Sequence, residues 1–184
     1  MRKALWMFVA VGVMACGVIG LKGRAVAQAN ATLQPGATAP DFKLPTQIDN
    51  VSASLKDYKG KFVVLYFYPK DMTSGCTIEA HNFERDTAKY AAANAVVLGV
   101  SLDTVESHKT FCSKDGLNFK LLADPDHKVI DAYGVPVSSM GPVKFAKRDT
   151  FLIGPDGKIL NFWEVKDIQN HSDQILAAIA EAKK

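Results

Sequence analysis

Cys76 stands where the chain most favours chemistry. It follows an apolar stretch, residues 62–67, and precedes a segment with helical periodicity, residues 77–90. A thiol at such a strand-to-helix corner lies near free backbone N–H groups and the positive end of the helix dipole, and both stabilise the thiolate. A buried inert thiol is the ordinary alternative, but Ser74 and Gly75 make this corner polar. We therefore predict that Cys76 is a nucleophile.

Two residues of the same run are placed to assist a reaction at the sulfur. Pro69 ends the apolar stretch and has no N–H to donate. Thr73 precedes Cys76 by three residues, within one turn of a helix. Its hydroxyl suits a helix cap, or a hydrogen bond to an oxygen attached to the sulfur, and the two roles are compatible. Glu79, one turn after Cys76, is either a partner of the loop or helix start, or an exposed carboxylate.

Arg148 is one of only two arginines in residues 30–184, which contain sixteen lysines. It comes just before a strand-like stretch, residues 150–153, so the end of a strand can direct its guanidinium at the thiolate. There it would stabilise the negative charge and present N–H donors in a fixed plane. A surface cation beside Lys144 and Lys147 is the alternative.

Cys112 is the second candidate thiol, and it falls on a predicted helix, residues 105–114, beside Phe111. It is either a buried inert thiol or a resolving thiol that attacks oxidised Cys76. A disulfide needs Cα atoms within about 7 Å, and both cysteines lie in or next to helices, so we expect local unwinding. The four histidines lack metal-ligand spacing, so we expect no metal site and solvated or capping roles for His81, His108, His127 and His171.

Residues 1–29 have the composition of a signal peptide. Arg2 and Lys3 precede an apolar run, residues 4–19, and Ala27-Gln28-Ala29 forms a small-x-small cleavage site. We predict cleavage after Ala29 and export across a bacterial inner membrane into the periplasm, with no stable membrane insertion afterwards. A lipid anchor on Cys16, or an uncleaved membrane anchor, is the alternative.

The charge of the chain depends on this segment. It holds four of the 22 Lys and Arg residues and none of the 19 Asp and Glu residues, so residues 30–184 carry a net charge near −1. No basic patch with interleaved aromatic residues remains, which argues against a nucleic-acid partner. Two cysteines in an oxidising compartment usually form a structural disulfide. A domain of this size does not need one, so a cycling disulfide is the sharper hypothesis.

The hydrophobic pattern predicts a flexible leader, residues 30–38, before a single domain, residues 39–184. Three buried strands are predicted to alternate with helices: residues 62–67, 77–90, 95–101, 105–114, 120–122 and 127–133. Short edge strands precede them, and a hairpin and a last helix follow: residues 41–44, 48–53, 150–153, 159–165 and 172–182. This order predicts an α/β fold with a mixed central sheet, centred on residues 62–67, and helices on both faces.

Seven motifs extend over nearly all of the chain after residue 29: Gly36-x-x-Ala-Pro-Asp-Phe-x-Leu44, Tyr66-Phe-Tyr-Pro-Lys-Asp71, Thr73-x-x-Cys-Thr-x-Glu-Ala80, Gly99-Val-Ser101, Ser107-His-x-x-Phe111, Leu121-Leu-Ala-Asp124 and Arg148-x-Thr-Phe-Leu-Ile153. Together they resemble the peroxiredoxins, in particular the branch called PrxQ or bacterioferritin comigratory protein. The resemblance implies a thioredoxin-like fold and a peroxidatic Cys76. It also implies that Pro69, Thr73 and Arg148 form the pocket of this cysteine.

The chain departs from many members of this branch at one position. They carry a resolving cysteine five residues after the peroxidatic one, where this chain has His81. Other members place it in the next helix, which Cys112 occupies here. The resemblance therefore implies an intramolecular Cys76–Cys112 disulfide, and a one-cysteine peroxidase that uses an external thiol is the alternative.

The resemblance thus implies a thiol-dependent peroxidase that reduces hydrogen peroxide and organic hydroperoxides without a cofactor. A thioredoxin-like dithiol protein would restore the thiols, and the branch favours a monomer. An exported thiol-disulfide oxidoreductase is a rival, but that chemistry uses Cys-x-x-Cys and this chain has Thr73 at the first position. A copper-carrying protein that binds through Cys76 and a histidine is a second rival.

Overall fold

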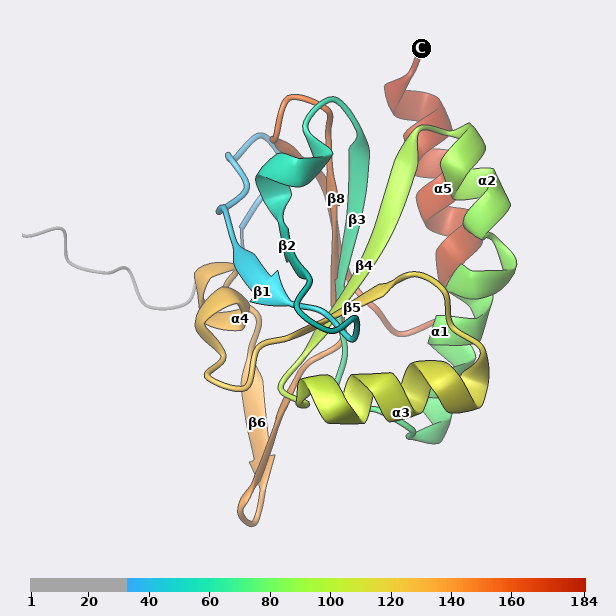
Figure 1. The fold of residues 1–184 in the computed structure, drawn as a ribbon. Coiled ribbons are helices and arrows are strands. Elements are labelled where there is room, and N and C mark those ends of the chain that lie inside the picture. The colour runs from blue at the N-terminus through green and yellow to red at the C-terminus, as the bar shows by residue number, and fades with distance from the viewer. Residues whose placement is uncertain (1–32) are drawn as a thin grey trace, which may run out of the picture.

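Five strands form the central sheet of the protein, in the spatial order β5-β4-β3-β8-β9 (Figure 1). The structure is a computed structural model and describes residues 33–184. The strands are β3 (Phe62–Phe67), β4 (Ala95–Ser101), β5 (Lys120–Ala123), β8 (Asp149–Ile153) and β9 (Ile159–Glu164). β3, β4 and β5 run parallel, whereas β8 pairs antiparallel with β3 and with β9. The predicted mixed α/β sheet is confirmed.

β3 lies in the middle of this sheet because its sequence suits burial on both faces. All six of its residues are buried. Val64 and Tyr66 pack into one apolar cluster, whereas Leu65 and Phe67 pack into the other. Side chains of a strand alternate between faces, so a continuous apolar run fills the core on both sides.

The two faces of the sheet are covered differently. On one face the core includes residues of α1 (Ser74–Arg85), α3 (Val105–Asp115) and α5 (His171–Ala182), and α2 (Thr87–Ala92) packs against β4. The other face is covered by shorter elements, namely β1 (Lys43–Pro45), β2 (Ser52–Ser54), η1 (Leu55–Tyr58) and α4 (Lys128–Ala132). Figure 1 shows α1, α2 and α5 on one side of the sheet and α4, β1 and β2 on the other. Helices therefore flank both faces, as predicted.

Part of the predicted leader is included in the described residues. Gly36 N donates to Ile159 O at 2.8 Å, and Ala39 N donates to Gly157 O at 2.9 Å, so this segment pairs with the start of β9. The predicted signal peptide, including Cys16, lies outside the described residues. Within residues 33–184, none of the helices has both the length and the apolar character needed to cross a membrane.

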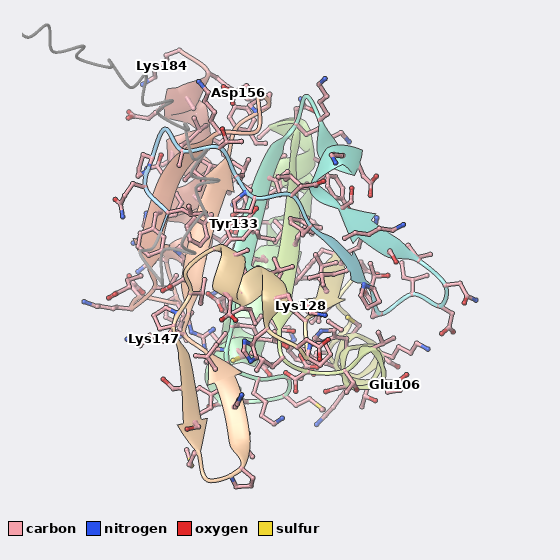
Figure 2. All side chains as sticks on the ribbon, turned by 90° about the vertical axis from the view of Figure 1, so that its left-hand side faces the viewer. Glu106, Lys128, Tyr133, Lys147, Asp156 and Lys184 are labelled. Atoms are coloured by element: carbon pink, nitrogen blue, oxygen red, sulfur yellow. The ribbon has the colours of Figure 1, made fainter. Side chains whose placement is uncertain are left out.

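Two local features differ from the sequence prediction. The helix predicted over residues 77–90 is two helices, α1 and α2, that meet at Asp86, and α1 begins three residues earlier. A hairpin, β6 (Val137–Met140) and β7 (Val143–Ala146), was not predicted. It projects from the body of the protein (Figure 1), and Figure 2 shows Lys147 at its base. There Lys147 N donates to Pro136 O at 2.8 Å and closes the hairpin.

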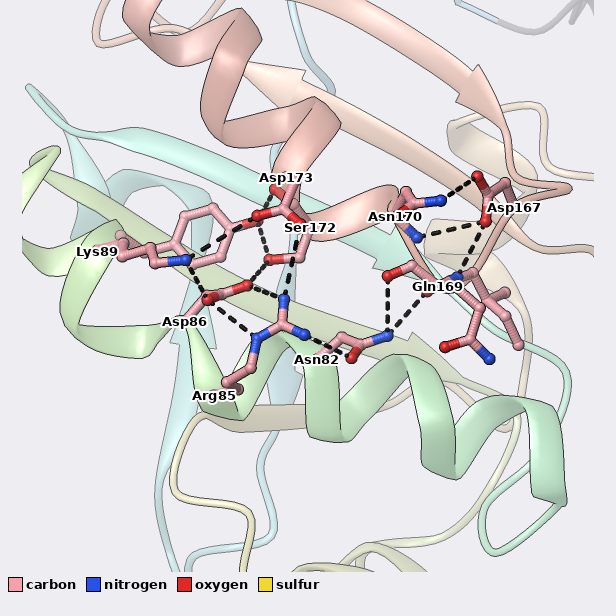
Figure 3. A network of polar contacts seen from close by, with 11 residues as sticks. Asn82, Arg85, Asp86, Lys89, Asp167, Gln169, Asn170, Ser172 and Asp173 are labelled. Atoms are coloured by element: carbon pink, nitrogen blue, oxygen red, sulfur yellow. Dashed lines mark hydrogen bonds and ion pairs between the residues drawn. The ribbon is translucent and has the colours of Figure 1, made fainter.

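Asp86 explains the break between α1 and α2 (Figure 3). Its buried carboxylate accepts hydrogen bonds from Arg85 Nη2 at 2.5 Å, Lys89 Nζ at 2.8 Å and Ser172 Oγ at 2.8 Å. Ser172 lies in the first turn of α5, so this one carboxylate joins the α1–α2 corner to the last helix. Asn82 Nδ2 adds a hydrogen bond to Ile168 O at 3.0 Å. The C-terminal half of α1 is therefore fixed to the α5 segment.

We predict that Asp86→Ala lowers the free energy of unfolding by about 2 kcal/mol, because buried Ser172 loses a charged partner. Chemical denaturation at pH 7 measures this. The hydrogen bond from Arg85 helps to hold the pKa of Asp86 well below its usual range. The loss should therefore be full at neutral pH and shrink as the pH falls below about 4.

Asp173→Ala is the matched control, since Asp173 is half-exposed and lies 3.9 Å from Arg85 and from Lys89 in the same network. Such an exposed pair contributes less than about 1 kcal/mol. Equal losses for the two variants would contradict the anchoring role of Asp86.

Candidate active site

The first turn of α1 holds Cys76. Thr73 ends the loop after β3 with an extended backbone, and its carbonyl accepts from Thr77 N at 2.9 Å to start the helix. The cysteine is only 2% exposed and packs in the apolar cluster with Tyr66 and Phe83. The predicted strand-to-helix corner is present, with the sulfur inside the first helical turn and covered by protein.

Arg148 reaches this sulfur from the start of β8, the antiparallel neighbour of β3. Its Nη2 donates to Cys76 Sγ at 3.1 Å, and its Nη1 donates to Glu79 Oε2. The guanidinium arrives there because Arg148 precedes β8, whose first residue, Asp149, pairs with Phe67 at the end of β3. Its side chain is only 16% exposed, which does not fit the surface-cation alternative. The structure thus brings together two residues that lie 72 positions apart.

Glu79 fixes the position of the Arg148 guanidinium by accepting a hydrogen bond from its Nη1. It is 1% exposed, and burial raises its pKa to about 7 against the opposing charge of Arg148. For Arg148 itself, burial lowers the pKa, but the charges of Glu79 and Cys76 outweigh burial and the net shift is upward. The guanidinium therefore stays charged while it donates to the sulfur. The exposed-carboxylate interpretation of Glu79 is wrong.

Pro69 and Thr73, which precede Cys76 in the chain, border an open groove. Thr73 is the N-cap residue of α1, but its Oγ1 donates to Lys70 O at 3.0 Å and makes no cap bond to the helix. The groove has a volume of about 400 Å³ and a nearly apolar lining. Its far wall comes from the unpredicted hairpin, through Met140, Val143 and Phe145.

Cys112 occupies α3 in the same apolar cluster as Cys76, and both thiols are free. It is 9% exposed. Burial raises the pKa of Cys112 to about 12, and the negative charges of Asp71, Glu84 and Asp115 add to the shift. In this reduced state the second thiol is therefore held in its neutral form.

Two of the four histidines correct the sequence prediction. His108 and His171 are buried, at 0% and 1% exposed, whereas solvated or capping roles were expected. His171 Nε2 bonds Thr150 Oγ1 at 2.9 Å, and burial lowers its pKa to about 4. Sequence reasoning also missed Asp71, a buried carboxylate that bonds His108. Among residues 33–184, no group of three or more His, Cys, Asp or Glu side chains is arranged to hold a metal ion.

A family model described as AhpC/TSA matches residues 35–162, which include four of the five sheet strands, the start of β9, both cysteines and Arg148. The chain belongs to the AhpC/TSA family. Relatives include Peroxiredoxin Bcp of Bacillus subtilis (strain 168), 38% identical over 153 residues that cover 82% of this chain and 97% of the relative. Peroxiredoxin Bcp of Escherichia coli (strain K12) is 40% identical over 152 residues, 81% of this chain and 97% of the relative.

Solved structures agree with this membership. Peroxidoxin BcpB from Mycobacterium tuberculosis superposes with a TM-score of 0.76 at 30% identity, covering 83% of this chain and 99% of that chain. A structure of Xanthomonas campestris Peroxiredoxin Q superposes with a TM-score of 0.73 at 34% identity, covering 84% of this chain and 99% of that chain. The predicted thioredoxin-like peroxiredoxin fold and the PrxQ resemblance are confirmed. The protein is a thiol-dependent peroxidase of the Bcp/PrxQ group, with a peroxide substrate and a thiol reductant.

We predict that Glu79→Gln slows the reaction of Cys76 with hydrogen peroxide in a pH-dependent way. Above pH 7 wild-type Glu79 is ionised and holds Arg148, so the wild type should react about tenfold faster than the variant at pH 8. Below pH 7 Glu79 takes up a proton and resembles glutamine. The ratio of the two rate constants, measured by stopped-flow fluorescence, should therefore approach one near pH 6, and a ratio independent of pH would contradict this role.

Proposed function

We propose that Cys76 is the peroxidatic cysteine. Its thiolate attacks one oxygen of a hydroperoxide, and the S–O bond of a sulfenic acid forms as the O–O bond breaks. The leaving hydroxide or alkoxide takes a proton from solvent and departs as water or an alcohol. The observation that carries this proposal is the 3.1 Å hydrogen bond from Arg148 Nη2 to Cys76 Sγ. One guanidinium N–H stabilises the thiolate, and its fixed plane places further donors where charge develops on the peroxide.

Pro69 and Thr73 complete the proposed pocket. Pro69 offers no N–H that would compete for the peroxide. The Thr73 hydroxyl, three residues before the sulfur, can turn from Lys70 O toward a bound peroxide oxygen. Organic hydroperoxides are proposed substrates as well, because the adjacent groove presents apolar side chains to an alkyl group. One solved relative, the Bacterioferritin Comigratory Protein of Xanthomonas campestris, is described with alkyl peroxide reduction activity.

We propose that Cys112 resolves the oxidised Cys76 as an intramolecular disulfide. Both thiols are free and belong to one apolar cluster. Two solved variants of Xanthomonas campestris Peroxiredoxin Q carry cysteine substitutions 36 positions apart, which is the spacing of Cys76 and Cys112. Disulfide geometry requires Cα atoms within about 7 Å. The first turn of α1 is the part free to unwind, since the Asp86 network fixes the other end of that helix.

The catalytic cycle ends with the reduction of the disulfide. A thioredoxin-like dithiol protein is the proposed reductant, because it converts one disulfide back to two thiols by exchange. We further propose that the protein acts as a monomer in the periplasm, after removal of residues 1–29 as a signal peptide.

The test compares wild type, Cys76→Ser and Cys112→Ser with hydrogen peroxide and an organic hydroperoxide. Cys76→Ser should lose peroxide consumption in both assays, because no other described thiol has a guanidinium partner. Wild type treated with one equivalent of peroxide should lose two mass units as an internal disulfide forms, measured by intact mass.

Cys112→Ser should consume one equivalent of peroxide and then stop when a thioredoxin-like donor is the only reductant. Sustained turnover by Cys112→Ser would support the one-cysteine alternative. Retained turnover by Cys76→Ser would contradict the whole assignment.

A further inference from the structure

A buried polar network joins the active-site loop to the helix of the second cysteine. Asp71, 3% exposed, accepts from Tyr68 Oη at 2.7 Å, from Ser107 Oγ at 2.7 Å and from His108 Nδ1 at 2.8 Å. Its backbone N–H donates to Asp103 Oδ2 at 2.9 Å. The loop before Thr73 and the first turn of α3 are therefore held together by one carboxylate.

The network fixes the tautomer of His108. Burial raises the pKa of Asp71, but hydrogen bonds from His108, Tyr68 and Ser107 outweigh burial, so the net shift of this pKa is downward. The carboxylate of Asp71 is therefore ionised. An ionised carboxylate only accepts, so His108 Nδ1 carries a proton. In the neutral ring, Nε2 of His108 then carries a lone pair that can accept a proton. It is buried and has no hydrogen-bond partner in the described part of the chain.

His108 and Cys112 lie four residues apart on α3. Side chains at this spacing are neighbours on one helix face, with Cβ atoms about 6 Å apart. The Cys112 side chain leans toward the preceding turn, which His108 occupies. The charge of Asp71 also acts on the Cys112 thiol more strongly than that of any other carboxylate, which places the thiol close to the Asp71–His108 pair.

We propose that His108 is the base that takes the proton of Cys112 when this thiol attacks oxidised Cys76, and that Asp71 orients and supports His108. The inference rests on the proposed resolving role of Cys112. The arrangement of carboxylate, imidazole and thiol is the one that activates nucleophiles in other enzymes, in which the carboxylate holds the imidazole tautomer.

The step balances without a further reagent. His108 Nε2 accepts the S–H proton of Cys112, and the thiolate forms an S–S bond to the sulfenic sulfur of Cys76. The S–O bond of the sulfenic acid breaks, and the leaving hydroxide takes the proton from the imidazolium to become water. Cys112 is oxidised, Cys76 sulfenic acid is reduced to the disulfide level, and His108 returns to its neutral form.

The surrounding charges make such a base necessary. Asp71, Glu84 and Asp115 oppose a thiolate at Cys112. Tyr66 of β3 and Tyr68, directly after this strand, are buried with raised pKa values, so they stay neutral. At a pKa near 12, only about one Cys112 thiol in 10⁵ ionises unaided at pH 7. An imidazolium at His108 is stabilised by Asp71, since it completes an ion pair with that carboxylate.

The test measures the rate of disulfide formation in reduced protein after one equivalent of hydrogen peroxide, by rapid alkylation and intact mass, from pH 6 to pH 9. His108→Asn keeps an N–H donor toward Asp71 but has no group at the Nε2 position. We expect it to form the disulfide about 100-fold more slowly at pH 7. Its rate should rise about tenfold per pH unit, as Cys112 then ionises unaided, whereas the wild-type rate should level off.

The rate of Cys76 oxidation, followed in the same samples, should stay within twofold of wild type in His108→Asn. If that variant fails to fold, His108→Gln takes its place with the same expected pH slope. His127→Gln changes a half-buried histidine paired with Asp131; it is the matched control and should match wild type throughout.

A wild-type rate and pH profile in the His108 variant would overturn this inference and leave the proposed function intact. A wild type that forms no internal disulfide would instead refute the resolving role of Cys112, and this inference with it.

Discussion

The proposed chemistry of Cys76 depends on one buried contact, the guanidinium of Arg148 held between Glu79 and the sulfur of Cys76. An ordinary cysteine thiol with a pKa of about 8.5 is only ~3% ionised at pH 7, so complete ionisation raises its rate ~30-fold, or about 2 kcal/mol. Enzymes commonly lower barriers by about 8 kcal/mol or more. Positioned N–H donors must therefore supply most of the catalysis, and Glu79 matters because it fixes their direction.

The rest of the fold places this contact and limits what can move. β3 and β8 pair antiparallel in the sheet, so the loop after β3 and the residue before β8 meet at the same end of these two strands. α1 is anchored at its C-terminal end by Asn82 and Asp86, while its first turn holds Cys76. α3 is anchored at its own first turn through Asp71. Each cysteine thus lies on a helix with one end fixed to the body of the protein.

The features that the sequence predicted well were those encoded locally. Six consecutive apolar residues predicted β3, because a strand whose two faces are both buried has apolar side chains at every position. The scarcity of arginine and the motif around Cys76 predicted that Arg148 would lie at the thiol. The glycine that follows α3, Gly116, adopts the left-handed conformation that ends helices, with a φ of 68°.

The missed features depend on partners far away in the sequence. The break at Asp86 arises from Ser172, which lies 86 positions later. The hairpin β6–β7 carries serines and a Gly-Pro turn, a weak strand pattern, and its apolar residues face the groove beside Thr73. His108 looked like a solvated residue because its partner, Asp71, lies 37 positions earlier. Its four-residue spacing from Cys112 was the one local signal for its position.

The role of the guanidinium can be measured through the second-order rate constant of Cys76 with hydrogen peroxide in Arg148→Met and Arg148→Lys, by stopped-flow fluorescence on folded protein. We expect a loss of about 100-fold or more for Arg148→Met, since both the charge and the fixed donors are removed. The rate constant of Arg148→Lys should fall between those of wild type and Arg148→Met, because lysine keeps the charge but not the planar pair of donors. An Arg148→Met rate constant within twofold of wild type would show that the guanidinium does not drive the reaction at Cys76.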